Sequence, residues 1–161
     1  TLEKLYLPNY RHNINLPNNL IDLHIGWMDL FDIPSTVKYL KLSNFDKVIS
    51  KCQYKLPENL YSLDMCKFNK KFTKTCLPKK LVNLELYFFY NEWIKPGCLP
   101  DNIKSIRITN MELTPGLLPK NLEIVNILCD YIKINSIPEN IKRINFELSV
   151  KNIEKNSIPL K

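Results

Sequence analysis

The nine residues from Pro78 to Leu86 (PKKLVNLEL) contain the pattern that decides the fold. A proline is followed by two polar residues and then by apolar residues spaced L-x-x-L-x-L. Eight prolines follow Leu or Ile and begin such a unit, at spacings of 17 to 23 residues: Pro17, Pro34, Pro57, Pro78, Pro100, Pro119, Pro138 and Pro159. A fixed pattern at this spacing indicates an internal structural repeat.

The apolar triplet is complete in every unit that the chain spans. The triplets are Leu2/Leu5/Leu7, Leu20/Leu23/Ile25, Val37/Leu40/Leu42, Leu60/Leu63/Met65, Leu81/Leu84/Leu86, Ile103/Ile106/Ile108, Leu122/Val125/Ile127 and Ile141/Ile144/Phe146. The last two members of each triplet have the period of two that is typical of a strand, so they face one side and the residue between them faces the other. One unit cannot cover its own apolar face, whereas stacked units share a continuous core.

These observations predict an α/β-type repeat solenoid of the leucine-rich-repeat kind. We expect one right-handed, curved solenoid over residues 1–161, with about eight units of 17–23 residues. A parallel β-sheet should form its concave face, with loops or short helical turns on the convex side. The chain begins inside a unit and stops after Pro159, so we expect it to be a segment of a longer array. A helical array is disfavoured because no 3.6-residue apolar stripe of useful length lies between consecutive prolines.

The turns also carry a resemblance to a known family. The stretches Phe68-Asn69, Ile94–Pro100 and Leu113–Pro119 resemble FNIP repeats, which run a Phe-Asn pair, a Pro-Gly turn and then Leu-Pro before the strand. The resemblance covers nearly the whole chain, although Phe68-Asn69 is the one match to the naming dipeptide. FNIP repeats occur mainly in social amoebae and giant DNA viruses. The resemblance implies an interaction scaffold without catalytic residues.

Composition narrows the class of protein. The chain is 45% hydrophobic and lacks the ~18 uninterrupted apolar residues of a membrane span, which argues against both disorder and membrane insertion. Its five cysteines (Cys52, Cys66, Cys76, Cys98 and Cys129) form no CxxC pair and have no zinc spacing with the two histidines. We therefore expect reduced thiols in the cytoplasm, the host cytoplasm if the protein is viral, and neither metal nor cofactor.

Enzymatic constellations are weak. His24 and Cys66 occupy strand positions two units apart, which is too far for a reliable nucleophile pair at ~4.8 Å per strand. Asp64 and Glu85 occupy equivalent positions on neighbouring strands, but an open strand face gives little of the burial that acid–base work needs. They should form an acidic spot flanked by Lys41 and Arg107. We therefore expect no enzymatic activity.

The outward strand positions indicate the binding face. They carry four basic and four acidic residues and so sum to zero, although the whole chain has a net charge of +7. Aromatic residues on a face of mixed charge are typical of protein–protein interfaces. The predicted partner is another protein, bound on the concave sheet by Tyr39, Lys41, Asp64, Glu85, Tyr87, Arg107 and Trp27.

A second binding class stays open. Six lysines fall within fourteen residues that contain no Asp or Glu: Lys67, Lys70, Lys71, Lys74, Lys79 and Lys80. This ridge predicts, as the alternative, a module that contacts nucleic acid or the ribosome through phosphates. The competing interpretation is a solvated lysine-rich surface.

Overall fold

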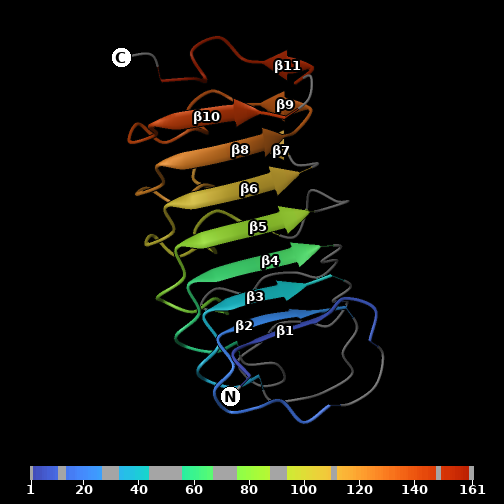
Figure 1. Ribbon diagram of the computed structural model, residues 1–161. Helices are drawn as coiled ribbons and strands as arrows, with labels where there is room; N and C mark the ends of the chain where they lie inside the picture. The colour runs from blue at the N-terminus through green and yellow to red at the C-terminus, as the bar shows by residue number, and fades with distance from the viewer. Residues whose placement is uncertain are drawn as a thin grey trace.

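The computed structural model describes residues 2–10, 14–26, 33–43, 56–66, 76–87, 94–109, 112–147 and 150–159. Each apolar triplet gives one strand of a single eight-stranded sheet. The strands are β1 (Lys4–Leu7), β2 (Asp22–Ile25), β3 (Tyr39–Leu42), β4 (Ser62–Cys66), β5 (Asn83–Tyr87), β6 (Ser105–Thr109), β8 (Ile124–Leu128) and β10 (Arg143–Phe146). They follow one another in chain order from β1 to β10, and every pair is parallel (Figure 1).

The repeats are stacked in register. Leu23 lies opposite Leu40, and Leu84 lies opposite Leu63 on one side and Ile106 on the other. Because the triplets of all units lie at the same position along their strands, side chains that are equivalent in sequence form columns along the stack. The columns on one face of the sheet make the core, and those on the other face are open to solvent.

The core comprises the triplets of the six central units. All eighteen of their side chains, from Leu20 to Ile127, are buried. The end units differ, since Leu2 and Phe146 are 49% and 42% exposed. An end strand has one neighbour instead of two, so its inward side chains are covered on one side.

The proline of each unit begins the turn that leads into the strand. Its carbonyl accepts a hydrogen bond from the backbone N–H three residues later, as from Leu20 to Pro17 (3.2 Å) and from Leu81 to Pro78 (3.2 Å). The residue before the first triplet member then joins neighbouring repeats. Asn59 Nδ2 donates to the Ser35 carbonyl (3.3 Å), and the side chains of Asn102 and Asn140 bond the preceding repeat in the same way.

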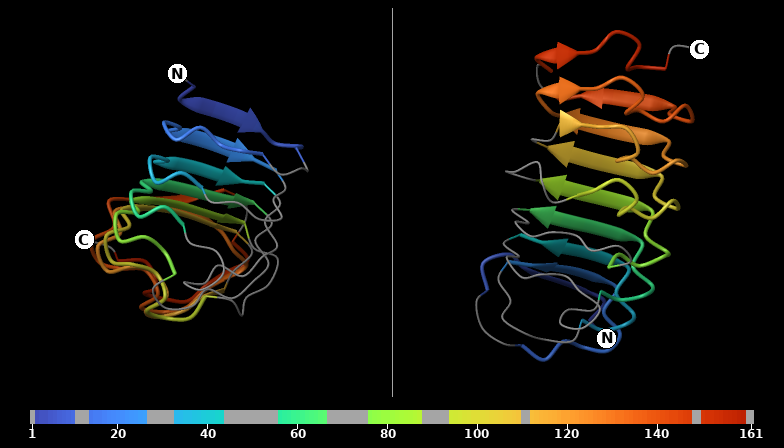
Figure 2. Two further views of the ribbon diagram at one scale, coloured as in Figure 1. Left: turned by 90° about the horizontal axis from the view of Figure 1, so that it is seen from below. Right: turned by 180° about the vertical axis from the view of Figure 1, so that it is seen from behind.

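Turns and a second sheet occupy the side opposite the large sheet. The second sheet has three short parallel strands, β7 (Glu112–Leu113), β9 (Tyr131–Ile132) and β11 (Asn152–Ile153), seen from behind in Figure 2. Leu113 and Ile132 point into the core and are fully buried. The sequence also permits short helical turns on this side, but the described residues form strands and turns there instead.

Type II turns occur at four places in the described part of the chain, three of them directly after β7, β9 and β11. Gly97 and Gly116 have φ values of +78° and +76°, and Asn135 and Asn156 take the equivalent place with φ values of 60° and 64°. Each turn closes with a hydrogen bond from the fourth residue to the first, as from Leu117 N–H to the Thr114 carbonyl (3.2 Å). Glycine and asparagine are the residues that adopt this left-handed conformation at least cost.

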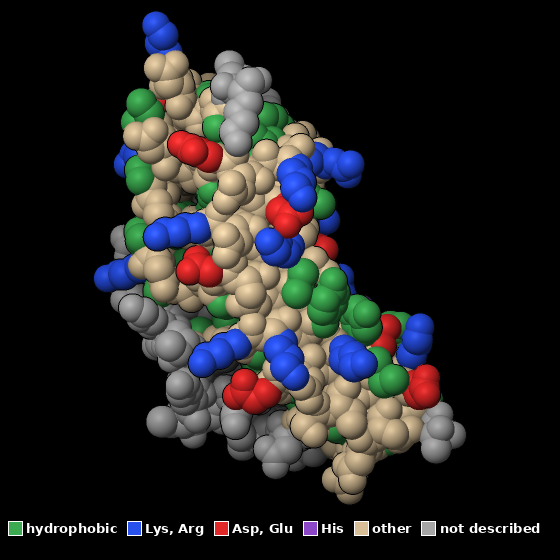
Figure 3. Space-filling model, turned by 90° about the vertical axis from the view of Figure 1, so that its left-hand side faces the viewer, with side chains coloured by type: hydrophobic (Ala, Val, Ile, Leu, Met, Phe, Trp, Pro, Cys, Tyr) green, Lys and Arg blue, Asp and Glu red, His purple; other side chains and the backbone are tan. Residues whose placement is uncertain are grey.

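The stack is bent, and the sheet lies on its hollowed side (Figures 2 and 3). The predicted curved solenoid with a parallel sheet on its concave face is therefore confirmed. Across the described parts of the chain, no helix is long and apolar enough to cross a membrane.

Candidate functional site

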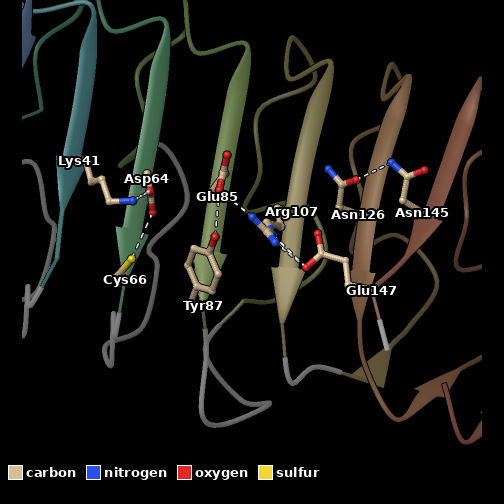
Figure 4. A network of polar contacts seen from close by, with 9 residues as sticks. All are labelled: Lys41, Asp64, Cys66, Glu85, Tyr87, Arg107, Asn126, Asn145 and Glu147. Atoms are coloured by element: carbon tan, nitrogen blue, oxygen red, sulfur yellow. Dashed lines mark hydrogen bonds and ion pairs between the residues drawn. The ribbon is translucent and has the colours of Figure 1, made fainter. Parts of the chain in front are cut away.

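The open face of the large sheet carries a column of polar side chains. The column runs from Tyr6 on β1 to Asn145 on β10, and each strand contributes one residue from its middle part. Its members, in register, are Tyr6, His24, Lys41, Asp64, Glu85, Arg107, Asn126 and Asn145. Each of these residues lies between two apolar triplet residues, which are buried in the six central strands, so the alternation of the strand turns it outward. Figure 4 shows the central part of this polar column.

The first group in the column centres on Asp64. Lys41 Nζ on the preceding strand lies 2.5 Å from Asp64 Oδ2, and the Cys66 thiol donates to Oδ1 at 3.5 Å (Figure 4). The hydrogen bond to Asp64 raises the pKa of Lys41. Burial, with the nearby Asp64 carboxylate, raises the pKa of the Cys66 thiol. The thiol is therefore protonated at neutral pH and is a poor nucleophile.

The second group centres on Arg107 of β6. Its Nη2 and Nε donate to Glu147 Oε2 at 2.6 and 3.1 Å, and its Nη1 lies 3.6 Å from Glu85 Oε2. The Tyr87 hydroxyl donates to the same Glu85 oxygen at 3.1 Å, and the guanidinium lies 5.4 Å from the centre of the Tyr87 ring. Burial, followed by the Glu85 charge, raises the pKa of Tyr87 to about 12. Arg107 thus bridges a carboxylate of β5 and the carboxylate of Glu147, which directly follows β10.

The charges on the open face neutralise one another. Lys41 pairs with Asp64, and Arg107 pairs with Glu85 and Glu147. Farther along the column, Asn145 Nδ2 donates to Asn126 Oδ1 at 2.7 Å. A surface whose central cations are already paired with carboxylates is poorly suited to binding a line of phosphates.

The exposed tyrosines of the sheet face lie in its N-terminal half. Tyr6, Tyr39 and Tyr61 are 56%, 45% and 42% exposed, and the Tyr39 and Tyr61 rings meet edge to face with centroids 6.0 Å apart. Tyr87, by contrast, is half-buried. Tyr61 lies one residue before β4, at a position that the strand pattern does not count as part of the face, so the sequence reasoning missed it.

The structure brings most of the predicted partner-binding residues onto one face. Tyr39, Lys41, Asp64, Glu85, Tyr87 and Arg107 all lie on the open side of β3, β4, β5 and β6. Trp27 lies outside the described residues. So do four residues of the lysine ridge, Lys67, Lys70, Lys71 and Lys74, whereas Lys79 and Lys80 are exposed in the turn before β5.

The two candidate chemical pairs have other partners. The His24 ring nitrogen Nε2 is 2.8 Å from Ser43 Oγ, while Cys66 is bonded to Asp64. Asp64 and Glu85 are directly opposite each other in register, and each has its own cation, as the acidic spot flanked by Lys41 and Arg107 requires. Among the described side chains, no three His, Cys, Asp or Glu residues are grouped to hold a metal ion.

Comparison with protein families finds a match for part of the chain. Residues 90–130 match the family described as FNIP Repeat. This stretch of the chain is similar to FNIP repeats. The match covers the Pro-Gly turns at Gly97 and Gly116 and the strands β6 and β8, so the resemblance recognised from these turns is confirmed.

A solved structure supports the same architecture. The chain is similar to "The crystal structure of CroV588 a novel circular LRR protein structure", with a TM-score of 0.68 and 23% identity over 88% of this chain. The similarity covers 23% of that protein, so the present chain spans about a quarter of its length. Comparison with curated proteins found no match. The likeness identifies a leucine-rich-repeat-like fold.

Proposed function

We propose that this chain is a non-enzymatic interaction scaffold that binds a partner protein on its concave sheet face. The observation that carries the proposal is the open face itself, on which eight strands in register present paired charges and exposed tyrosines. Leucine-rich-repeat-like folds typically mediate protein interactions. Extended concave surfaces are the binding surfaces of solenoids.

The chemistry of the face supports binding over catalysis. The thiol of Cys66 is held protonated, and the phenol of Tyr87 has a pKa raised to about 12, so neither is activated for reaction at neutral pH. Cys66 and Cys129 are free thiols, which supports action in a reducing compartment such as the cytoplasm.

Two variants test the proposed face. A pull-down from extract of cells that express the protein, with and without nuclease, supplies the partner. Tyr87→Ala should weaken partner binding about tenfold or more, because central aromatic residues carry much of the energy of an interface. The double reversal Lys79→Glu/Lys80→Glu should change binding little, since these lysines lie in a turn. Urea denaturation of both variants establishes that each is folded.

The alternative makes the opposite prediction. If nuclease releases the partner, or if the lysine reversal abolishes binding while Tyr87→Ala does not, the lysine ridge binds nucleic acid and the scaffold proposal fails. Salt dependence gives an independent measurement, because duplex DNA contacts give a log–log slope near about −0.9 per phosphate.

A further inference from the structure

The edge where the strands begin carries an apolar strip built from four consecutive repeats. We call Ile21, Tyr39, Tyr61 and Val82 the tyrosine strip; its two tyrosines are exposed and its two aliphatic residues half-buried. Figure 3 looks onto this edge and shows hydrophobic side chains gathered there between Lys and Arg residues. The strip is separate from the polar column, whose central side chains from Lys41 to Asn145 have polar partners on the sheet face.

The backbone holds the strip at a fixed spacing. Lys38 and Tyr39 N–H groups donate to the Ile21 carbonyl, and Tyr61 N–H donates to the Lys38 carbonyl at 2.8 Å. Ile21, Lys38, Tyr61 and Val82 therefore occupy equivalent places just before β2, β3, β4 and β5. Ile21 and Tyr61 lie two strands apart, which is ~9.6 Å at ~4.8 Å per strand.

Three donor groups at the tyrosine strip are available to a ligand. The structure shows no hydrogen bond from the Tyr39 or Tyr61 hydroxyl to any described residue, unlike the Tyr6 hydroxyl, which donates to Asp22 at 2.7 Å, and the Tyr87 hydroxyl, which donates to Glu85. The exposed Lys38 ammonium likewise has no acidic partner among the described side chains. A ligand that complements this strip supplies acceptors for two phenols and one carboxylate for Lys38.

We propose that the tyrosine strip binds an extended, proline-rich segment of a partner protein that carries an acidic residue. This inference rests on the scaffold function proposed above and names the chemistry of the partner. A polyproline II helix has no internal hydrogen bonds, so its carbonyls are free to accept from phenol hydroxyls. It also repeats every three residues at ~3.1 Å each, and the resulting ~9.3 Å matches two strand steps along the stack.

The geometry favours a peptide over single-stranded nucleic acid. The Tyr39 and Tyr61 rings meet edge to face at 64°, so they do not present two parallel faces to successive bases, whereas an aromatic surface of this kind suits a proline-rich segment. Stacking of successive bases uses open ring faces together with a line of cations that follows the backbone. The described cations near the strip do not form such a line. Lys104 pairs with Glu123 and Lys80 donates to Asn59, which leaves Lys38 for a ligand.

Three synthetic peptides test the assignment by calorimetry and by amide chemical shifts of the labelled chain. The first has seven prolines in nine residues, with one leucine and one central aspartate. The second replaces the aspartate with lysine, and the third replaces the prolines with glycine. We expect the first to bind and to shift the amides around the tyrosine strip, and the glycine peptide to bind at least about tenfold more weakly because it is not preorganised.

Variants assign the binding to named side chains. Tyr61→Ala should weaken binding of the aspartate peptide about tenfold or more. Lys38→Glu should weaken the aspartate peptide and improve the lysine peptide, which a general loss of folding cannot produce. Ile134→Ala is the matched control, because Ile134 is also an exposed apolar residue (43%) but belongs to a different turn. It should leave binding unchanged.

Three outcomes would overturn the assignment: equal binding of the glycine peptide, unchanged binding by Tyr61→Ala, or shifts at the strip caused by oligouridylate but not by the proline-rich peptide. If any of these is observed while Tyr87→Ala still abolishes binding of the partner, the proline-rich assignment fails and the scaffold function stands. Conversely, if the peptide binds at the tyrosine strip while binding of the partner is insensitive to Tyr87→Ala, the strip binds its ligand independently of the surface around Tyr87.

Discussion

Gly26 lies directly against the backbone of the preceding repeat. Its N–H donates to the Leu7 carbonyl at 3.0 Å, and a Cβ atom built on it would lie 1.6 Å from the Pro8 carbonyl oxygen. The close approach explains a glycine at a place where the other strands carry a larger residue, such as Cys66 on β4 and Tyr87 on β5. Gly97, in an open turn, is needed for a different reason, since its φ is +78°.

Gly26→Ala should therefore destabilise the first repeat. The backbone of Pro8 has to move, at a cost of about 1–3 kcal/mol in the free energy of unfolding. Urea denaturation and hydrogen exchange of the β1 amides measure the effect. Gly97→Ala is the control, because nothing lies within 4 Å of its Cβ and its cost, about 1–2 kcal/mol, is backbone strain alone. Unchanged exchange of β1 in Gly26→Ala would contradict the contact.

His24 gives the sheet face a pH dependence. Burial and the nearby Lys41 charge lower its pKa below the usual 6.5, against smaller opposing effects of Asp64 and Asp22. The folded chain thus binds a proton at His24 less readily than the unfolded chain does. Its contribution to stability is present above about pH 6.5 and is lost as the pH falls below that value. In His24→Gln this part of the pH dependence should disappear from urea unfolding curves between pH 7 and 5. An unchanged slope would show that another group is responsible.

At the scale of the elements, the strands were predictable and the turns were less so. The triplet positions predicted each strand of the large sheet because burial on one face sets a period of two. The type II turns at Gly97 and Gly116 follow the Pro-Gly signal. The same turns at Asn135 and Asn156 lack both residues, since Ile134 and Lys155 stand where proline would be. Asparagine tolerates positive φ, but on its own it is too common in this chain to mark a turn.

The core behind the large sheet was harder to predict. The sequence pattern does not show which residues after β8 enter the core. The buried residues there are Cys129 and Ile132, while Tyr131 is half-buried and its hydroxyl donates to Glu154 at 2.6 Å. The second sheet causes this difference, because pairing of β9 with β7 and β11 fixes which of its side chains points inward. Two-residue strands leave no periodic signal in the sequence.

The sequence predicted which residues make up most of the candidate site, but it did not predict all of their contacts. Register alone placed Lys41 beside Asp64 and Glu85 beside Arg107. The contact from Arg107 to Glu147 spans two strands, and it depends on side-chain reach and on the curvature of the sheet. The exposure of Tyr61 depends on where its strand begins. Neither quantity is a property of the repeat pattern.

At the scale of the whole molecule, charge is separated between the two kinds of surface. The open face was predicted to be neutral from the repeat register, and the ion pairs of Lys41 and Arg107 agree with that sum. The net charge of +7 therefore belongs to the turns and the remaining surface, where Lys79, Lys95 and Lys120 are exposed. A partner on the open face thus binds through shape, aromatic contacts and matched polar groups, with a weak dependence on salt.

The stack also predicts how stability is distributed along the chain. Leu84, in a central repeat, is fully buried between two neighbours, so Leu84→Ala should cost about 2–5 kcal/mol in urea denaturation. Leu5, on the end strand β1, is partly buried and has one neighbour, so Leu5→Ala should cost clearly less. The end repeat can fray without unfolding the rest, because each unit of a solenoid contacts its neighbours alone. Equal losses at the two positions would mean that the chain unfolds as one compact core, in which the order of the repeats has no bearing on stability.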